Sequence, residues 1–212
     1  MSLLFLGMTV GFIYLNSLLF SKPPSDLQSV DLEFPLRTPW VIAQGGNTVL
    51  MNTHQNTESQ SQSLDIVGLT FGSSRADGVA PVALEQYVIF EKPVFSPCDG
   101  EIIAVEGRFP DQEIGDINRL YPAGNYVIIH CSNSSILLAH LCNGSITVDI
   151  GDIVTKGQVI GKVGNSGNST EPHLHIQAVV GKVDDVQMFV NGAKPVVMTF
   201  GGRYLKRGEF GD

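Results

Sequence analysis

Two of the five histidines in this chain stand two positions apart, in the sequence Pro172-His173-Leu174-His175-Ile176. Successive side chains of an extended strand point to opposite faces, so His173 and His175 are predicted to face the same way. Two imidazoles on one face can bind a single metal ion. This pair is therefore the feature of the sequence best suited to chemistry.

Other side chains could complete a metal centre around the pair. His54 lies in the polar stretch 52–63, which should be solvated, and Asp65 follows it by eleven residues. A catalytic zinc site needs three protein ligands and one open position, which His54, Asp65 and one histidine of the pair could supply. The remaining histidines, among them His140, could orient a water and stabilise a developing oxyanion. That is the chemistry of amide hydrolysis, although a lone surface histidine would be equally typical at position 54.

The elements that must position these residues are predicted to be short strands. The 23 glycines and the many Val and Ile residues favour strands and turns over long helices, so we expect an all-β domain. Residues 124–130 and 136–141 are predicted to form a hairpin in which Ile136, Leu138 and His140 share one face. Asp99-Gly100 predicts a second hairpin, and a last strand pair is expected near 187–190 and 196–200.

The formal charge of −8, with 13 Lys and Arg residues that do not cluster, argues against a nucleic-acid surface. At 212 residues, one core with a small appendage is expected. Residues 1–22 contain the apolar run 3–20 and are predicted to be a membrane anchor or a signal segment, with a buried helix as the alternative. Residues 23–39, which include Pro23-Pro24, are expected to be a linker, and 40–212 the folded domain.

The three cysteines, Cys98, Cys131 and Cys142, cannot all pair within one chain, so no disulfide framework is implied. A single bridge between Cys131 and Cys142 stays open as an alternative. Metal binding by these thiols is disfavoured, because no C-x-x-C spacing is present.

Three motifs of the chain together resemble one family. They are Pro172-His173-Leu174-His175-Ile176 with the preceding 164–171 loop, Ala139-His140-Leu141, and the run Gly151-Asp152-x-Val154-x-x-Gly157-Gln158-x-Ile160-Gly161. In this order they closely resemble the lysostaphin-type (LytM-like) zinc endopeptidases. The resemblance covers about residues 40–180 and implies the duplicated-hybrid-motif fold, an antiparallel, barrel-like β-sandwich, here preceded by an N-terminal hydrophobic helix.

The resemblance also implies roles for individual residues. His54, Asp65 and His175 would be the zinc ligands, and His140 and His173 the catalytic histidines that do not bind zinc. His130 matches a family position without a direct zinc role. The family's commonest first motif is H-x-G-x-D, yet Ser61 stands four residues before Asp65; a longer-spaced variant beginning at Asn52-Thr53-His54 restores the ligand.

The implied function is hydrolysis of peptide bonds in bacterial peptidoglycan, in a stem or a cross-link. The location would be the extracytoplasmic cell envelope, with residues 3–20 as a membrane anchor and a regulatory protein partner left unidentified. Asn165, Asn168 and Glu171 are expected on a rim loop that contacts substrate, although Gly/Asn/Ser loops are usually only turns. Two alternatives stay open: a non-catalytic relative that binds the wall or activates an amidase, and a biotinyl- or lipoyl-like carrier, which would leave the histidines unexplained.

Overall fold

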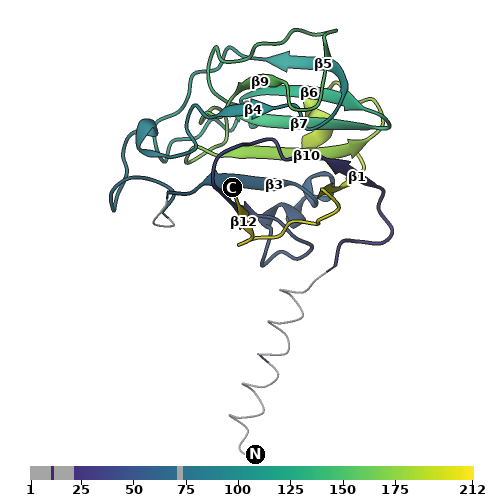
Figure 1. Cartoon of the computed structure of the whole chain (residues 1–212), viewed down its shortest axis with the longest axis horizontal. Helices are drawn as coiled ribbons and strands as arrows, with labels where there is room; N and C mark the ends of the chain where they lie inside the picture. Colours follow the sequence, from purple (N-terminus) through teal and green to yellow (C-terminus); the bar gives the residue numbers. More distant parts are fainter. Residues whose placement is uncertain (1–10, 12–21, 71–73) are drawn as a thin grey trace, which may run out of the picture.

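The computed structural model describes residues 22–70 and 74–212 together with Gly11, and strands dominate it (Figure 1). The strands are β1 (Ser29–Leu32), β2 (Trp40–Gln44), β3 (Leu64–Gly68), β4 (Pro93–Phe95), β5 (Gly100–Glu106), β6 (Asn125–Cys131), β7 (Ser134–Leu141), β8 (Ile153–Val154), β9 (Val159–Lys162), β10 (Leu174–Val180), β11 (Val197–Phe200) and β12 (Phe210–Gly211). The helices are the 3₁₀ turns η1 (Thr53–Asn56), η2 (Glu58–Gln60) and η3 (Leu84–Gln86), and the α-helix α2 (Val186–Val190).

Eight strands form one antiparallel sheet in the order β12-β2-β3-β10-β7-β6-β5-β8. The expectation of a mostly β, antiparallel fold is therefore confirmed. The sheet has two edges, β12 and β8, so the described strands do not close into a barrel. The N-terminal hydrophobic helix that we expected falls on residues that lie outside the described part of the chain, apart from Gly11.

The larger core lies between one face of this sheet and two small sheets, β1–β11 and β4–β9. Ile66, Ile129 and Leu138 of the large sheet are fully buried there, together with Val94 of β4 and Ile160 of β9. Alternation along the strands sends the intervening side chains to the opposite face. Asp65, next to Ile66, belongs to that opposite face, which carries the candidate site.

The opposite face is covered in part by α2, whose Phe189 is fully buried in a second apolar cluster. Our prediction of a strand at 187–190 is wrong, because the Asp185 side chain accepts a hydrogen bond from the Gln187 N–H and caps a short helix there. The strand predicted near 196–200 is confirmed as β11.

The hairpin predicted at 124–141 is confirmed as β6 and β7, which pair directly. The hairpin predicted at Asp99-Gly100 is wrong. Instead, β4 pairs with β9, and β5 pairs with β6 and β8. The Asp99 carboxylate accepts a hydrogen bond from the Lys156 N–H at 2.7 Å, so it fixes a distant segment and does not close a local turn.

The segment expected to be a linker contains structure that belongs to the fold. Within 23–39, β1 pairs in parallel with β11, and Leu32 and Leu36 are buried in the larger core. Folded structure therefore begins before Trp40, because β1 pairs with β11 and these apolar side chains join the larger core. Among the described residues, no helix is both long and apolar enough to cross a membrane.

Cys98 forms a disulfide with Cys131, and Cys142 is a free, buried thiol. The open alternative of a Cys131–Cys142 bridge is therefore wrong. Glu101 on β5 pairs with His130 on β6, and this register brings the turn before β5 beside the end of β6. The two bridged Cα atoms lie 6.2 Å apart, within the range that disulfides span.

Candidate metal centre

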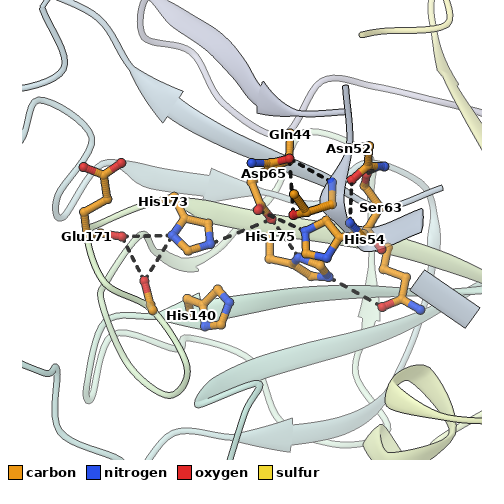
Figure 2. Close-up of polar contacts among 12 residues, drawn as sticks. Gln44, Asn52, His54, Ser63, Asp65, His140, Glu171, His173 and His175 are labelled. Carbon is orange, nitrogen blue, oxygen red and sulfur yellow. Dashed lines mark hydrogen bonds and ion pairs between the residues drawn. The ribbon is translucent and has the colours of Figure 1, made fainter. Parts of the chain in front are cut away.

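Asp65 is the centre of a cluster of histidines on the face of the large sheet that lies opposite the larger core (Figure 2). Its Oδ2 lies 3.0 Å from His54 Nε2, and its Oδ1 lies 2.8 Å from His175 Nδ1. His173 Nε2 is 3.8 Å from the same Oδ1. One carboxylate thus brings His54 together with the His173 and His175 pair, which lies far from it in the sequence.

The strand register explains how Asp65 and His175 meet. The two residues are paired directly across the antiparallel β3–β10 ladder, so their side chains lie on the same face. His173 immediately precedes β10 and faces the same carboxylate, as the His173-Leu174-His175 alternation predicted.

His54 reaches the site through the polar stretch 52–63, which is folded into η1 and η2. The Asn52 side chain caps η1 at the His54 N–H, and its amide donates to the Ser63 carbonyl at 3.1 Å. Thr53 N–H donates to the Gln44 side chain. Asn52 is fully buried, so the longer spacing between His54 and Asp65 is closed by a compact loop and not left as an open one.

The residues fit a zinc ion. One ligand atom each from His54, Asp65 and His175 lie within 4.8 Å of one another, and two imidazoles with one carboxylate are a donor set that catalytic zinc uses. His54 and Asp65 are partly exposed, whereas His175 is buried. The three predicted ligands are therefore brought together on one side of a cavity.

The cavity, of about 260 Å³, lies over this cluster and is also lined by His140, Ala123 and Phe189. An apolar wall beside a polar centre is typical of small-molecule and peptide sites.

The two predicted catalytic histidines are each held by one ring nitrogen. His140 Nδ1 donates to the Ser166 carbonyl at 2.8 Å, and His173 Nδ1 donates to the Glu171 carbonyl at 2.9 Å. A carbonyl only accepts, so both rings carry their hydrogen on Nδ1 and keep a lone pair on Nε2. Their ring centroids are 4.7 Å apart (Figure 2).

His140 enters the site by a change in the backbone. Its φ is +61°, and the β6–β7 register shifts at this point, where Tyr126 pairs with Ala139 and Asn125 with Leu141. The bulge turns His140 towards the face of Leu137 and Ala139. Our prediction that His140 shares a face with Ile136 and Leu138 is therefore wrong, because those two residues lie in the opposite core.

Burial and charge set the protonation of these groups. Burial alone would raise the pKa of Asp65, but the neighbouring His173 and His54 bring it well below its usual range. Burial, helped by His173 and His175, lowers the pKa of His140 well below that of a free imidazole. Burial likewise lowers the pKa of His175. At His54, burial would lower the pKa, but the neighbouring Asp65 carboxylate raises it. The site thus combines an ionised carboxylate with two imidazoles, His140 and His175, whose burial favours the neutral form.

The three residues expected to contact substrate differ in their placement. Asn165 is fully buried, and its side chain bonds the Gln112 carbonyl and the Ser169 hydroxyl, so it holds the loop and is not available to substrate. Asn168 is exposed and lines the cavity. The Glu171 side chain forms an ion pair with Arg75, while its carbonyl orients His173.

Two groups that contact the histidines from behind were not among the predicted site residues. Gln177 is buried beside His175, and the Ser166 carbonyl fixes His140. The spacing of Gln177, two residues after His175 on the same strand, is the signal that could have identified it.

Comparison with known proteins decides the family. Residues 87–187 match the model of peptidase family M23. This chain contains an M23 peptidase domain. The matched residues include His140, His173 and His175 but neither His54 nor Asp65. The place of those two in the site of this M23 domain therefore rests on the geometry described above.

Two curated relatives from Vibrio cholerae serotype O1 are similar to this chain. The peptidoglycan DD-endopeptidase ShyA is 35% identical over 89 residues, which are 42% of this chain and 17% of the relative. The peptidoglycan DD-endopeptidase ShyB is 36% identical over 89 residues, which are 42% of this chain and 18% of the relative. The match thus spans less than a fifth of either relative.

Solved structures are also similar to this chain. A zinc-containing peptidase from Vibrio cholerae has a TM-score of 0.42 and 22% identity, over 72% of this chain and 37% of that one. The catalytic domain of lysostaphin from Staphylococcus simulans has a TM-score of 0.37 and 23% identity, over 57% of this chain and 86% of that one.

Proposed function

We propose that this chain is a zinc-dependent endopeptidase that hydrolyses peptide bonds of bacterial peptidoglycan, in a stem or a cross-link. The observation that carries the proposal is the convergence of His54 and His175 on Asp65, with His140 and His173 beside them. The M23 match and the curated relatives, which are named as peptidoglycan DD-endopeptidases, support the substrate class.

His54, Asp65 and His175 would hold the zinc ion. Zinc in such a site supplies Lewis-acid polarisation and a water of lowered pKa. Asp65 stays ionised because its pKa is well below its usual range, so it is available as a ligand at neutral pH.

His140 and His173 would transfer protons during the reaction. Each ring donates Nδ1–H to a main-chain carbonyl, so its Nε2 lone pair can accept a hydrogen bond from the attacking water. An imidazole that has taken up a proton at Nε2 becomes a donor, and it can stabilise the developing oxyanion or return the proton to the leaving amine. The two main-chain contacts fix the rings before substrate arrives.

We further propose that the domain acts in the extracytoplasmic cell envelope, with residues 3–20 as a membrane anchor. A Cys98–Cys131 disulfide is typical of proteins in oxidising compartments, which supports this location. The absence of any cluster of cations in the sequence supports peptidoglycan over nucleic acid as the polymer that is bound.

The test is digestion of purified peptidoglycan by the protein from residue 22 onwards, with mass spectrometry of the released fragments. We expect new amino and carboxyl ends at one type of peptide bond, and loss of activity with a chelator. His175→Ala should lose both zinc and activity, because a ligand is removed, whereas His173→Ala should keep zinc and lose turnover. Intact peptidoglycan after incubation with zinc-loaded protein would instead favour the non-catalytic, wall-binding alternative.

A further inference from the structure

Gln177 is a buried polar residue that the proposed reaction does not use directly. It lies on β10 two residues after His175, on the same face of the sheet, and its exposed fraction is 1%. Its side-chain nitrogen donates to the Ser59 carbonyl at 2.7 Å and to the Phe189 carbonyl at 2.9 Å. Both amide hydrogens of Gln177 are therefore committed, one to η2 and one to α2.

These two bonds fix the direction of the amide. A flipped side chain would place its oxygen against two carbonyl oxygens, where neither could donate. The Gln177 Oε1 must therefore point the other way, and there it lies 3.5 Å from His175 Nε2. An amide oxygen only accepts, so it favours a hydrogen on that nitrogen.

The tautomer of His175 depends on two neighbours that compete for its hydrogen. The Asp65 carboxylate, 2.8 Å from Nδ1, favours hydrogen on Nδ1 when no metal is bound, whereas the Gln177 oxygen favours hydrogen on Nε2. Only the second form leaves a lone pair on Nδ1 that a cation shared with Asp65 could use. The Gln177 contact therefore stabilises the tautomer that metal binding requires.

We propose that Gln177 is a positioning residue that stabilises the His175 tautomer whose Nδ1 can bind zinc. The identity of the ion rests on the proposed function, whereas the choice of tautomer does not. Gln177 thus biases the centre towards its metal-bound form before any metal arrives.

The experiment compares three variants with the unaltered protein. Gln177→Met removes the acceptor and both donors, and Gln177→Glu keeps an acceptor beside His175 Nε2. Ser59→Ala is the matched control. It removes the bond from the Ser59 hydroxyl to the Val190 carbonyl, at 2.9 Å, which ties η2 to the end of α2, but it leaves the Ser59 carbonyl and Gln177 in place.

Two measurements are made on each protein. Nitrogen-15 NMR of the histidine rings in the metal-free state reports which ring nitrogen of His175 carries hydrogen, with signals assigned by their loss in His175→Ala. Competition with a chromogenic chelator reports the zinc dissociation constant.

We expect the fraction of His175 with hydrogen on Nε2 to be similar in the unaltered protein, in Gln177→Glu and in Ser59→Ala, and to be lower in Gln177→Met. Gln177→Met should also bind zinc about 10- to 100-fold more weakly, as for other partners that hydrogen-bond metal-binding histidines. Zinc affinity in Ser59→Ala should stay within a few fold of the original.

An unchanged tautomer population and zinc affinity in Gln177→Met would overturn the proposal. Equal zinc loss in Ser59→Ala would assign the effect to loop anchoring instead. If Gln177→Met does not fold, a smaller Nε2–H fraction in Gln177→Glu than in the unaltered protein still overturns it. A protein that binds no zinc but whose tautomer population depends on residue 177 would refute the proposed function and leave the role of Gln177 standing.

Discussion

His140 contributes an imidazole from a backbone position that most side chains avoid. Its φ of +61° lies in the left-handed region, where a β-branched or bulky residue is strained and Asn is among the best tolerated. Burial keeps the ring neutral, and the Ser166 carbonyl fixes its Nδ1. The side chain therefore reaches the cavity only because this bulge replaces regular strand geometry.

We predict that His140→Asn loses peptidase activity by about 10²- to 10⁴-fold while zinc content and thermal stability stay close to the original, because proton transfer is lost but Asn accepts the positive φ. Zinc analysis, melting temperature and fragment release from peptidoglycan check this. His130→Asn is the control, since His130 lies on the paired strand β6 and does not line the cavity. Full activity in His140→Asn would remove His140 from the mechanism.

At the scale of elements, the loop after β9 meets the segment before β6 at close range. Gly124 has a φ of +59°, and a Cβ there would lie 2.4 Å from the Ser166 carbonyl carbon and oxygen. The same Ser166 carbonyl accepts the hydrogen bond from His140 Nδ1. The position of His140 in the cavity therefore depends on a glycine that lets two main-chain segments touch.

We predict that Gly124→Ala destabilises the protein by about 3 kcal/mol or more and lowers activity, because the Cβ displaces the carbonyl that holds His140. The matched control is Gly144→Ala, where φ is +66° but no atom lies within 4 Å of the added Cβ. It should lose only about 1 kcal/mol and keep its activity. Chemical denaturation and peptidoglycan digestion measure both effects, and equal losses in the two variants would contradict the steric argument.

Sequence reasoning identified strands where local pattern decides the structure. The β6–β7 hairpin and β2 follow from short apolar runs rich in Val, Ile and Leu, and His173 and His175, two residues apart, both face Asp65 as predicted. The predictions were wrong where residues far apart in the sequence determine the local structure. Asp99 bonds Lys156 in place of closing a turn, and β1 is a strand because β11 lies beside it.

For the site, too, some features could be predicted from the sequence and others could not. Residue types suggested a metal centre of His54, Asp65 and one histidine of the 173/175 pair, and the family resemblance chose His175. The sequence gives no sign of the bulge that turns His140 over. Burial of Asn165 was equally hidden, because a loop rich in Gly, Asn and Ser looks solvated until its hydrogen-bond partners are known. Long-range register and main-chain contacts between loops therefore account for most of the errors.

At the scale of the whole molecule, two cysteines form a disulfide and the third is a buried free thiol. Cys98 and Cys131 join the turn before β5 to the end of β6. Burial, together with Asp111, raises the pKa of Cys142 to about 12. At pH 8 the reactive thiolate is then on the order of one part in ten thousand.

We predict that iodoacetamide at pH 8 leaves the native protein unmodified, because Cys142 is buried and protonated and the other two cysteines are bridged. Denaturation without a reductant should allow one modification, at Cys142, and reduction should raise the number to three. Intact mass and peptide mapping give these counts. Three modifications before reduction would rule out the Cys98–Cys131 bridge.

The chain ahead of β1 contacts the domain at Lys22. The Asn47 side chain donates to the Lys22 carbonyl, and from Ser29 onwards the backbone is paired with β11. If residues 3–20 anchor the chain as we propose, only a short connecting segment would separate the domain from the bilayer. Such an enzyme could trim only the layer of wall that passes next to its own membrane, and lengthening the 23–28 segment with a flexible insert would widen the zone it can reach.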